Sequence, residues 1–196
     1  NGGFLQIIPS VAPGAFGTTE RISVVGGAAN ITGGLTALTG GATILGPWMV
    51  NVTGSGNYLT LVDVGGGQMT LTNALPTMNI TTGTDLGNAV STDYLNITST
   101  LTGSNGLTKN ITVHALQILG TSNISGSSIT LNGGIISQAS TISSNLTFNN
   151  EADIYASAGT LAFTGNVVVA GGNDLVKSGA GLLNLANSNV GGMTGI

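Results

Sequence analysis

Apolar and polar residues alternate in short runs along most of the chain, which is the pattern of β-strands with one buried face. The clearest runs are residues 22–25, 49–53, 58–64, 69–72, 95–98, 111–114, 129–132, 146–148 and 161–164. No segment shows a helical stripe, because Thr, Asn and Gly interrupt every apolar stretch and few charged residues exist to solvate a helix face. The pattern therefore predicts an all-β chain.

Glycine pairs and clusters separate these runs. They occur at residues 26–27, 33–34, 40–41, 65–67, 133–134 and 171–172. Glycine adopts positive φ without a steric penalty, so we expect tight corners at these places.

Short strands with frequent corners fit a sandwich, a barrel or a solenoid. Aromatic residues make up only 4% of the chain, too few to fill a sandwich core about 10 Å thick. Ladders of Ile, Leu, Val and Ala suit a narrow tube, with Asn and Thr stacked at its corners. We therefore predict a right-handed parallel β-helix (β-solenoid) with irregular coils. It forms one domain over residues 1–196, in which residues 1–20 are an N-terminal cap or assembly segment.

Charge and cysteine content exclude several classes of protein. The net charge is −4, and three cations, Arg21, Lys109 and Lys177, are too few for a nucleic-acid surface. No apolar run approaches the roughly 18 residues of a transmembrane helix. Without cysteine, disulfides and thiolate sites are absent, which favours an exported bacterial protein, extracellular or at the cell surface. Since the chain starts at Asn1 without Met, we expect a mature or trimmed product.

The most specific motif lies near the C-terminus, where leucines, a lysine and glycines follow a fixed spacing. Its residues are Leu175, Lys177, Gly179, Gly181, Leu183, Leu185 and Asn189. This motif resembles the autotransporter-associated β-strand repeat, also called the passenger-associated transport repeat. Residues 113–196 resemble the family best, although the aromatic residue expected after Asn189 is missing and the following glycines are displaced. The resemblance implies a parallel β-helix, export through an outer membrane and a passive surface role.

The motif also has a physical interpretation. Leu175, Leu183 and Leu185 alternate correctly to enter a coil, while Gly179 and Gly181 bend the chain between two strands. Lys177 is expected to be a solvated or edge-facing charge. An uncapped solenoid end exposes unpaired backbone groups and invites another chain to pair. Our expected assembly contacts are Phe4, Leu5, Ile7, Ile8, Leu182 and Leu183.

Candidate chemistry is sparse. The only histidine, His114, follows an alternating run and is expected on a strand face. Glu151 and Asp153 form a carboxylate pair of the kind used in glycoside cleavage, or in calcium binding together with Asn149 and Asn150. A solvated turn is the default interpretation of this pair. Residues 171–175 faintly resemble a calcium-binding nonapeptide. Such a site needs the motif in successive turns, and here the motif occurs once, so we expect a plain corner.

Two further features have a functional and a structural interpretation. Asn-x-Ser/Thr triplets, whose middle residue is always Ile, Val or Leu, start at Asn30, Asn51, Asn79, Asn96, Asn110, Asn123 and Asn145. They are acceptors for N-glycosylation, or strand segments in which the middle residue points inward and Asn and Thr point outward. The single tryptophan, Trp48, is a candidate carbohydrate platform or a packing residue at a cap or subunit contact.

Together these features predict a secreted structural β-solenoid that forms a stiff surface fibre, stalk or adhesin passenger. Its expected partners are identical subunits or adjoining repeats, joined end to end or by insertion of residues 1–10 into a neighbour. The alternative is a module that binds glycans or host surfaces. A polysaccharide-degrading enzyme is the third hypothesis. The sites of such enzymes combine several acidic residues with Lys or Arg, and here no cation lies between Lys109 and Lys177. We expect no enzymatic activity, no cofactor and no metal.

Overall fold

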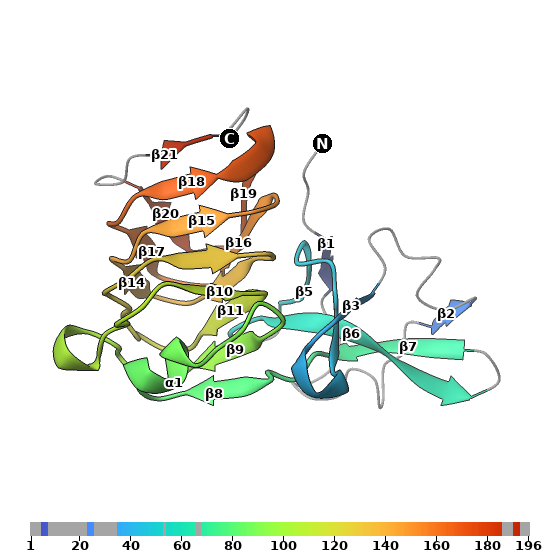
Figure 1. Ribbon diagram of the computed structural model, residues 1–196. Helices are drawn as coiled ribbons and strands as arrows, with labels where there is room; N and C mark the ends of the chain where they lie inside the picture. Colours follow the sequence, from blue (N-terminus) through green and yellow to red (C-terminus); the bar gives the residue numbers. More distant parts are fainter. Residues whose placement is uncertain are drawn as a thin grey trace.

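The computed structural model describes residues 5–7, 23–25, 35–52, 54–65, 68–185 and 190–192, with residues 5–7, 23–25, 65, 68 and 190 described by their backbone alone. The described part is mostly β, with many short parallel strands in stacked sheets (Figure 1). The expected solenoid-like architecture is thus confirmed at this level. The strand positions expected from the alternating runs are confirmed to within one or two residues at most ends.

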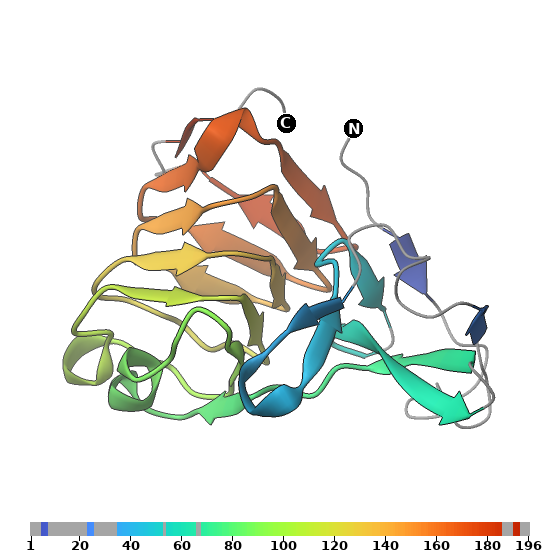
Figure 2. The same ribbon diagram turned by 45° about the vertical axis from the view of Figure 1, so that its right-hand side comes forward.

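Three parallel sheets form the coil (Figure 2). The first coil sheet contains β10 (Ile111–Val113), β12 (Ile129–Leu131), β15 (Leu146–Phe148), β18 (Val167–Val169) and β21 (Val190–Gly191). The second contains β8 (Met78–Ile80), β9 (Tyr94–Ile97), β11 (Ala115–Ile118), β13 (Ile135–Ser137), β16 (Ala152–Ala156) and β19 (Leu175–Ser178). The third contains β14 (Ser140–Ile142), β17 (Thr160–Phe163) and β20 (Leu182–Asn184).

From β12 onward the chain visits the three sheets in turn, so each coil lies directly on the preceding one. Ile129 pairs with Leu146, which pairs with Val167, placing aliphatic side chains in a column. A continuous core of Ile, Leu, Val, Ala and two phenylalanines fills the tube. Each fully buried Leu or Ile contributes roughly 1.5–3 kcal/mol relative to exposure, so these columns dominate the stability of the coil.

Asparagine side chains join successive coils from outside the core. The Asn96 amide donates to Asn79 over 2.8 Å, and the Asn149 amide donates to Asn132 over 2.8 Å, each pair being 17 residues apart. Asn145 accepts from the backbone N–H of Asn166 over 3.0 Å. The first bond lies between paired strands, β8 and β9, and the other two lie at corners, where they satisfy groups that regular strand pairing leaves over.

The N-terminal part departs from the expected parallel coil. β6 (Asn57–Gly65) and β7 (Gln68–Asn73) form an antiparallel hairpin, and β2 (Ser23–Val25) extends it. β5 (Met49–Asn51) is antiparallel to β6 but parallel to β1 (Leu5–Ile7), while β3 (Leu35–Ala37) is antiparallel to β4 (Thr43–Leu45). Alternation alone does not distinguish parallel from antiparallel pairing, because both give a period of two.

The structure contains short helical turns that the pattern did not predict. Besides the 3-10 turns Thr39–Gly41, Gly103–Asn105 and Ala170–Gly172, the described residues include one α-helical turn, α1 (Gly83–Gly87), which is capped by Thr82 and buries Leu86 completely. The Thr82 hydroxyl accepts from the Asp85 backbone, and the Asp85 carboxylate accepts from the Thr82 backbone. This reciprocal cap stabilises a turn too short to show any periodic stripe.

The antiparallel unit covers the outer face of the second coil sheet. Tyr94, Ala115, Ile136 and Tyr155 point outward from this sheet and pack with Tyr58, Val50 and Leu38. The Tyr58 and Tyr94 rings meet edge to face at a centroid separation of 5.2 Å. The Tyr94 hydroxyl donates to Gln117 over 2.7 Å, and the Gln117 amide donates to the carbonyl of Gly56 over 2.6 Å. The central strands of this sheet, β11, β13 and β16, are therefore buried on both faces.

Candidate functional site

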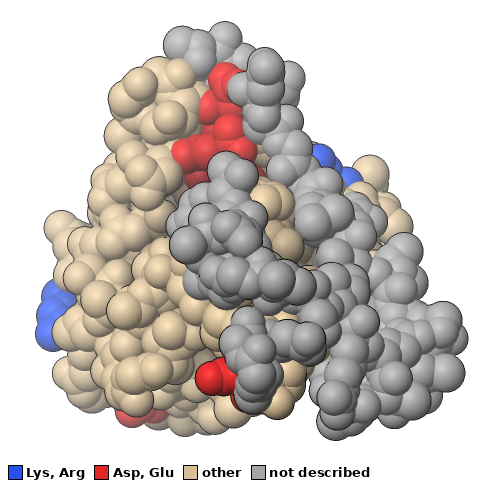
Figure 3. All heavy atoms as spheres, turned by 90° about the vertical axis from the view of Figure 1, so that its right-hand side faces the viewer, with Lys and Arg blue, Asp and Glu red and all other residues tan. Residues whose placement is uncertain are grey.

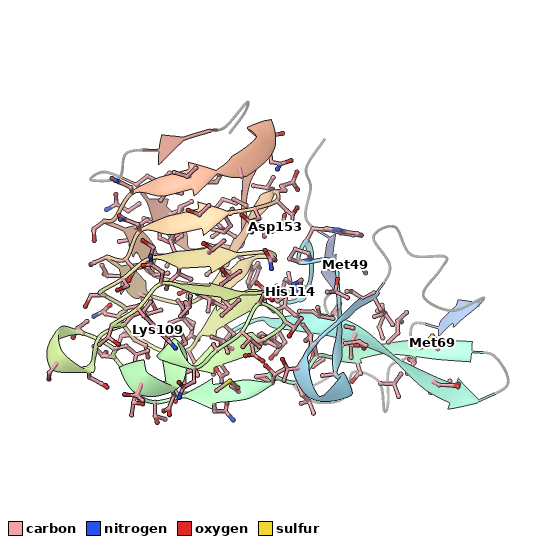
Figure 4. All side chains as sticks on the ribbon, viewed as in Figure 1. Met49, Met69, Lys109, His114 and Asp153 are labelled. Atoms are coloured by element: carbon pink, nitrogen blue, oxygen red, sulfur yellow. The ribbon has the colours of Figure 1, made fainter. Side chains whose placement is uncertain are left out.

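A hollow of about 340 Å³ lies where the antiparallel unit meets a corner of the coil. We call it the corner hollow. Thr36 of β3 and the loop Gly46, Pro47 and Trp48 line one side. The coil side is lined by His114, Asn132, Asn150, Glu151 and Asp153, all near the turn from the first to the second coil sheet. Figure 4 labels His114 and Asp153 at this edge of the coil, and the level of β12 and β13 lies between the two residues.

The structure brings together residues that the sequence offered only as separate candidates. Trp48, His114 and the pair Glu151 and Asp153 now share one hollow. Parallel stacking brings together the residues that line the hollow from the coil, because corners of successive coils lie above one another. Trp48 belongs to a segment far away in the sequence, so sequence spacing gave no link between it and His114 or the carboxylate pair.

Gly133 and Gly134 provide the room for this arrangement, but neither has the positive φ that we expected. A Cβ on Gly133 would lie 3.2 Å from His114 Nε2. A Cβ on Gly134 would lie 2.4 Å from the Asp153 carbonyl and 3.1 Å from the Tyr58 hydroxyl. The glycines here allow close approach of neighbouring groups. By contrast, Gly40, Gly41, Gly171 and Gly172 do have positive φ.

His114 directly follows β10, at the bend before β11, and not on a strand face as expected. Its side chain is only 7% exposed, and Nε2 has no hydrogen-bond partner. Burial lowers the pKa of His114 below its usual 6.5, so the ring is neutral at pH 7. A neutral imidazole offers one donor and one acceptor.

Asp153 is 3% exposed, and its Oδ1 has no hydrogen-bond partner. Burial, the charge of Glu151 and a hydrogen bond with the Glu151 side chain raise the pKa of Asp153 to about 8. At neutral pH Asp153 is therefore protonated and donates to Glu151. The corner hollow thus holds one negative charge on the carboxyl pair.

The buried Tyr58 hydroxyl lies next to this pair and has no hydrogen-bond partner. Burial, with smaller effects from Tyr94 and Asp153, raises the pKa of Tyr58 well above its usual value. The sequence gives no reason to choose Tyr58 as a candidate, because this residue is one position in an alternating strand. Together Tyr58, His114 and Asp153 leave three buried polar atoms without partners around one corner.

The geometry disfavours two chemistries considered from the sequence. Carboxyls joined by a hydrogen bond lie closer than the about 5–5.5 Å or 6.5–9.5 Å separations of glycosidases. For calcium, Asn149 and Asn150 already donate to Asn132, and within the described ranges no three His, Cys, Asp or Glu residues are grouped to hold a metal ion.

The described part of the C-terminal motif forms β19 and β20, the last described strands of the second and third coil sheets, while β21 continues the first sheet. Gly179 has a φ of 83° between β19 and β20, and Leu175 is buried while Leu183 and Leu185 pack partly against the core. Lys177 is exposed, and its ammonium donates to the Gly179 carbonyl over 2.6 Å. Its register partner is the core residue Ile154, so this lysine occupies a core-facing column at the edge. Asn189 lies outside the described residues.

An apolar hollow of about 450 Å³ opens at this level, lined by Leu175, Lys177, Gly181, Leu182, Leu183 and Leu185. Leu182 is 67% exposed. Two of the expected assembly contacts, Leu182 and Leu183, are thus at an edge of the third coil sheet. Leu5 and Ile7 belong to β1, which pairs with β5 of the same chain, whereas Phe4 and Ile8 lie outside the described residues.

Five of the seven Asn-x-Ser/Thr triplets follow the inward and outward pattern that we expected, and the triplet at Asn51 departs from it. The middle residues Ile80, Ile97, Ile111, Ile124 and Leu146 are all buried. Several of the asparagines bond to the neighbouring coil, as Asn123 does in accepting from the Thr141 backbone over 2.8 Å. Asn51 is buried and bonds to Asn73. Asn30 lies outside the described residues.

Comparison with protein-family models, with curated proteins and with solved structures finds no match to this chain. In the portion of the chain that the structure covers, no helix has the length and apolar character of a membrane span.

Proposed function

We propose that this chain is a structural β-solenoid, a stiff rod segment of a surface fibre, stalk or adhesin passenger that joins further coils end to end. The finer fold in this proposal is a right-handed parallel β-helix. Support for the handedness is general: connections between parallel strands of one sheet are right-handed in about 98% of cases.

The observation that carries the proposal is the edge formed by β19 and β20. Within the described residues each of these strands has a strand partner on one side only, and the apolar hollow opens beside them. Edge strands present unpaired N–H and C=O groups to another strand, and a stacked coil would bury the exposed Leu182. Stability in such arrays adds along the axis, which suits a mechanical rod.

Lys177 restricts what can stack on this edge. Charged residues, lysine above all, protect edge strands from unselective pairing. Because Lys177 occupies the column above Ile154, a partner coil has to offer it an acceptor or displace it toward solvent. This favours a matching coil over an arbitrary strand.

The resemblance to the autotransporter-associated repeat supports export to the cell surface, and the proposal places the protein there. Its partners are then identical subunits or adjoining repeats. No catalytic role is part of the proposal.

The test compares two exposed leucines. Leu182 is 67% exposed at the coil edge, and Leu75 is 75% exposed on the distant antiparallel unit. We expect concentration-dependent association of the protein in analytical ultracentrifugation and rods in electron micrographs. Leu182→Asp should weaken association about tenfold, the effect of roughly 1.4 kcal/mol, whereas Leu75→Asp should not.

Discrete globular monomers at high concentration would contradict the fibre proposal. Equal weakening by both aspartate variants would place the contact elsewhere and contradict the role of the edge.

A further inference from the structure

The corner hollow combines an aromatic surface with unused polar groups. Trp48 packs partly against the buried cluster of Leu45, Met49 and Leu59, and the rest of it lines the hollow. Opposite it, His114 and Asp153 are more than nine-tenths buried, and each has a polar atom without a partner.

Such unpartnered atoms cost free energy. Burying a donor or acceptor without a hydrogen bond costs about 1–3 kcal/mol, and native proteins keep few such groups. Two of them, on His114 and Asp153, belong to residues that line the hollow and therefore point to a role beyond packing. A ligand that brings hydroxyl groups would supply the missing partners.

The charge of the corner hollow further restricts the class of ligand that it can bind. The carboxyl pair carries one negative charge, and among the described residues neither lysine nor arginine lines the hollow. Figure 3 looks at this side of the molecule and shows the largest group of Asp and Glu atoms in its upper part, with smaller groups lower down and the blue Lys and Arg atoms outside the largest group. Anionic ligands, including uronic and sialic acids, are therefore disfavoured.

The groups also suit hydroxyl recognition in detail. The free carboxyl oxygens of Glu151 and Asp153 accept, and a neutral imidazole and the amides of Asn132 and Asn150 can both donate and accept. A volume of about 340 Å³ lies at the small end of the about 300–1,000 Å³ range of ligand pockets. That is room for a small saccharide unit.

From these observations we propose that the corner hollow binds a neutral sugar residue of a glycan, with Trp48 against its apolar face and the corner polar groups on its hydroxyls. The binding is non-covalent and needs no second subunit. It is therefore independent of the end-to-end stacking proposed above.

Trp48 is the only tryptophan in the sequence, so its fluorescence reports on this hollow directly. The experiment titrates the whole chain with glucose, galactose, N-acetylglucosamine and their β-linked disaccharides, and with glucuronate as the anionic probe. We expect a saturable change in Trp48 emission with at least one neutral sugar and none with glucuronate.

Matched variants locate the site. Thr36→Val and Asn150→Ala alter groups that line the hollow, whereas Thr98→Val and Asn88→Ala alter exposed residues remote from it. The first pair should each weaken binding about tenfold, through loss of one hydrogen bond, and the second pair should leave it unchanged. Thermal unfolding of each variant verifies that it is folded.

Three outcomes would overturn the proposal. These are no saturable emission change with any neutral sugar up to its solubility, equal binding of glucuronate, or equal effects of the hollow and remote variants. Each is distinct from a failure to stack, which ultracentrifugation measures separately.

Discussion

At the scale of single residues, the corner hollow depends on the protonation of Asp153. Its pKa of about 8 arises chiefly from burial, with the Glu151 charge adding to it. In the unfolded chain the same carboxyl ionises near pH 4. Between these values the folded protein binds one more proton than the unfolded chain, so this group makes stability fall as pH rises.

We predict that Asp153→Asn removes this dependence. The asparagine amide still donates to Glu151 but does not titrate. The variant should match the native protein near pH 4 and become more stable than it by a few kcal/mol at pH 8. Urea unfolding at pH values between 4 and 8 measures the difference.

The opposing contribution of His114 cancels in this comparison. Its lowered pKa adds stability that is present above pH 6.5 and lost as pH falls, in both proteins alike. Parallel stability profiles for the two proteins would show that Asp153 does not hold its proton near neutral pH.

At the scale of elements, the loop between β5 and β6 holds the antiparallel unit against the coil. Gly56 lies at this contact, and its carbonyl accepts the Gln117 amide. Gln138 donates to Ser55 over 2.7 Å, which ties the same loop to a further coil. The loop is therefore part of the fold's core and not a free turn.

We predict that Gly56→Ala destabilises the protein more than Gly54→Ala. Both glycines have positive φ, 85° and 67°, so both substitutions introduce about 1 kcal/mol of backbone strain. Only at Gly56 does the new Cβ meet a neighbour, the Tyr155 ring at 2.7 Å, which adds about 1–3 kcal/mol. Urea unfolding of the two variants measures the gap. Equal losses would mean that the loop does not press on the coil.

At the scale of the whole molecule, stability is uneven along the coil axis. β11 and β13 have a strand on each side, and core residues and the antiparallel unit cover their two faces. β19 and β20 have a described partner on one side only. In stacked arrays the terminal levels open before the middle.

We predict that amide hydrogen exchange is slowest in β11 and β13 and markedly faster in β19 and β20. Mass spectrometry of peptides from these segments measures the order. The stacking proposed above should slow exchange in β19 and β20 as protein concentration rises, with little change in β11. Uniform exchange along the axis would contradict this gradient.

The sequence by itself determined the strand positions, the aliphatic core and the inward direction of residues such as Ile97 and Ile124, because a period of two follows from strand geometry alone. It also indicated the corner at Gly171 and Gly172. Only the tertiary structure decided that β6 and β7 pair antiparallel, that α1 forms, and that Trp48 meets His114 and Asp153. Those outcomes depend on which distant segments pack together, and local patterning carries no information about that choice.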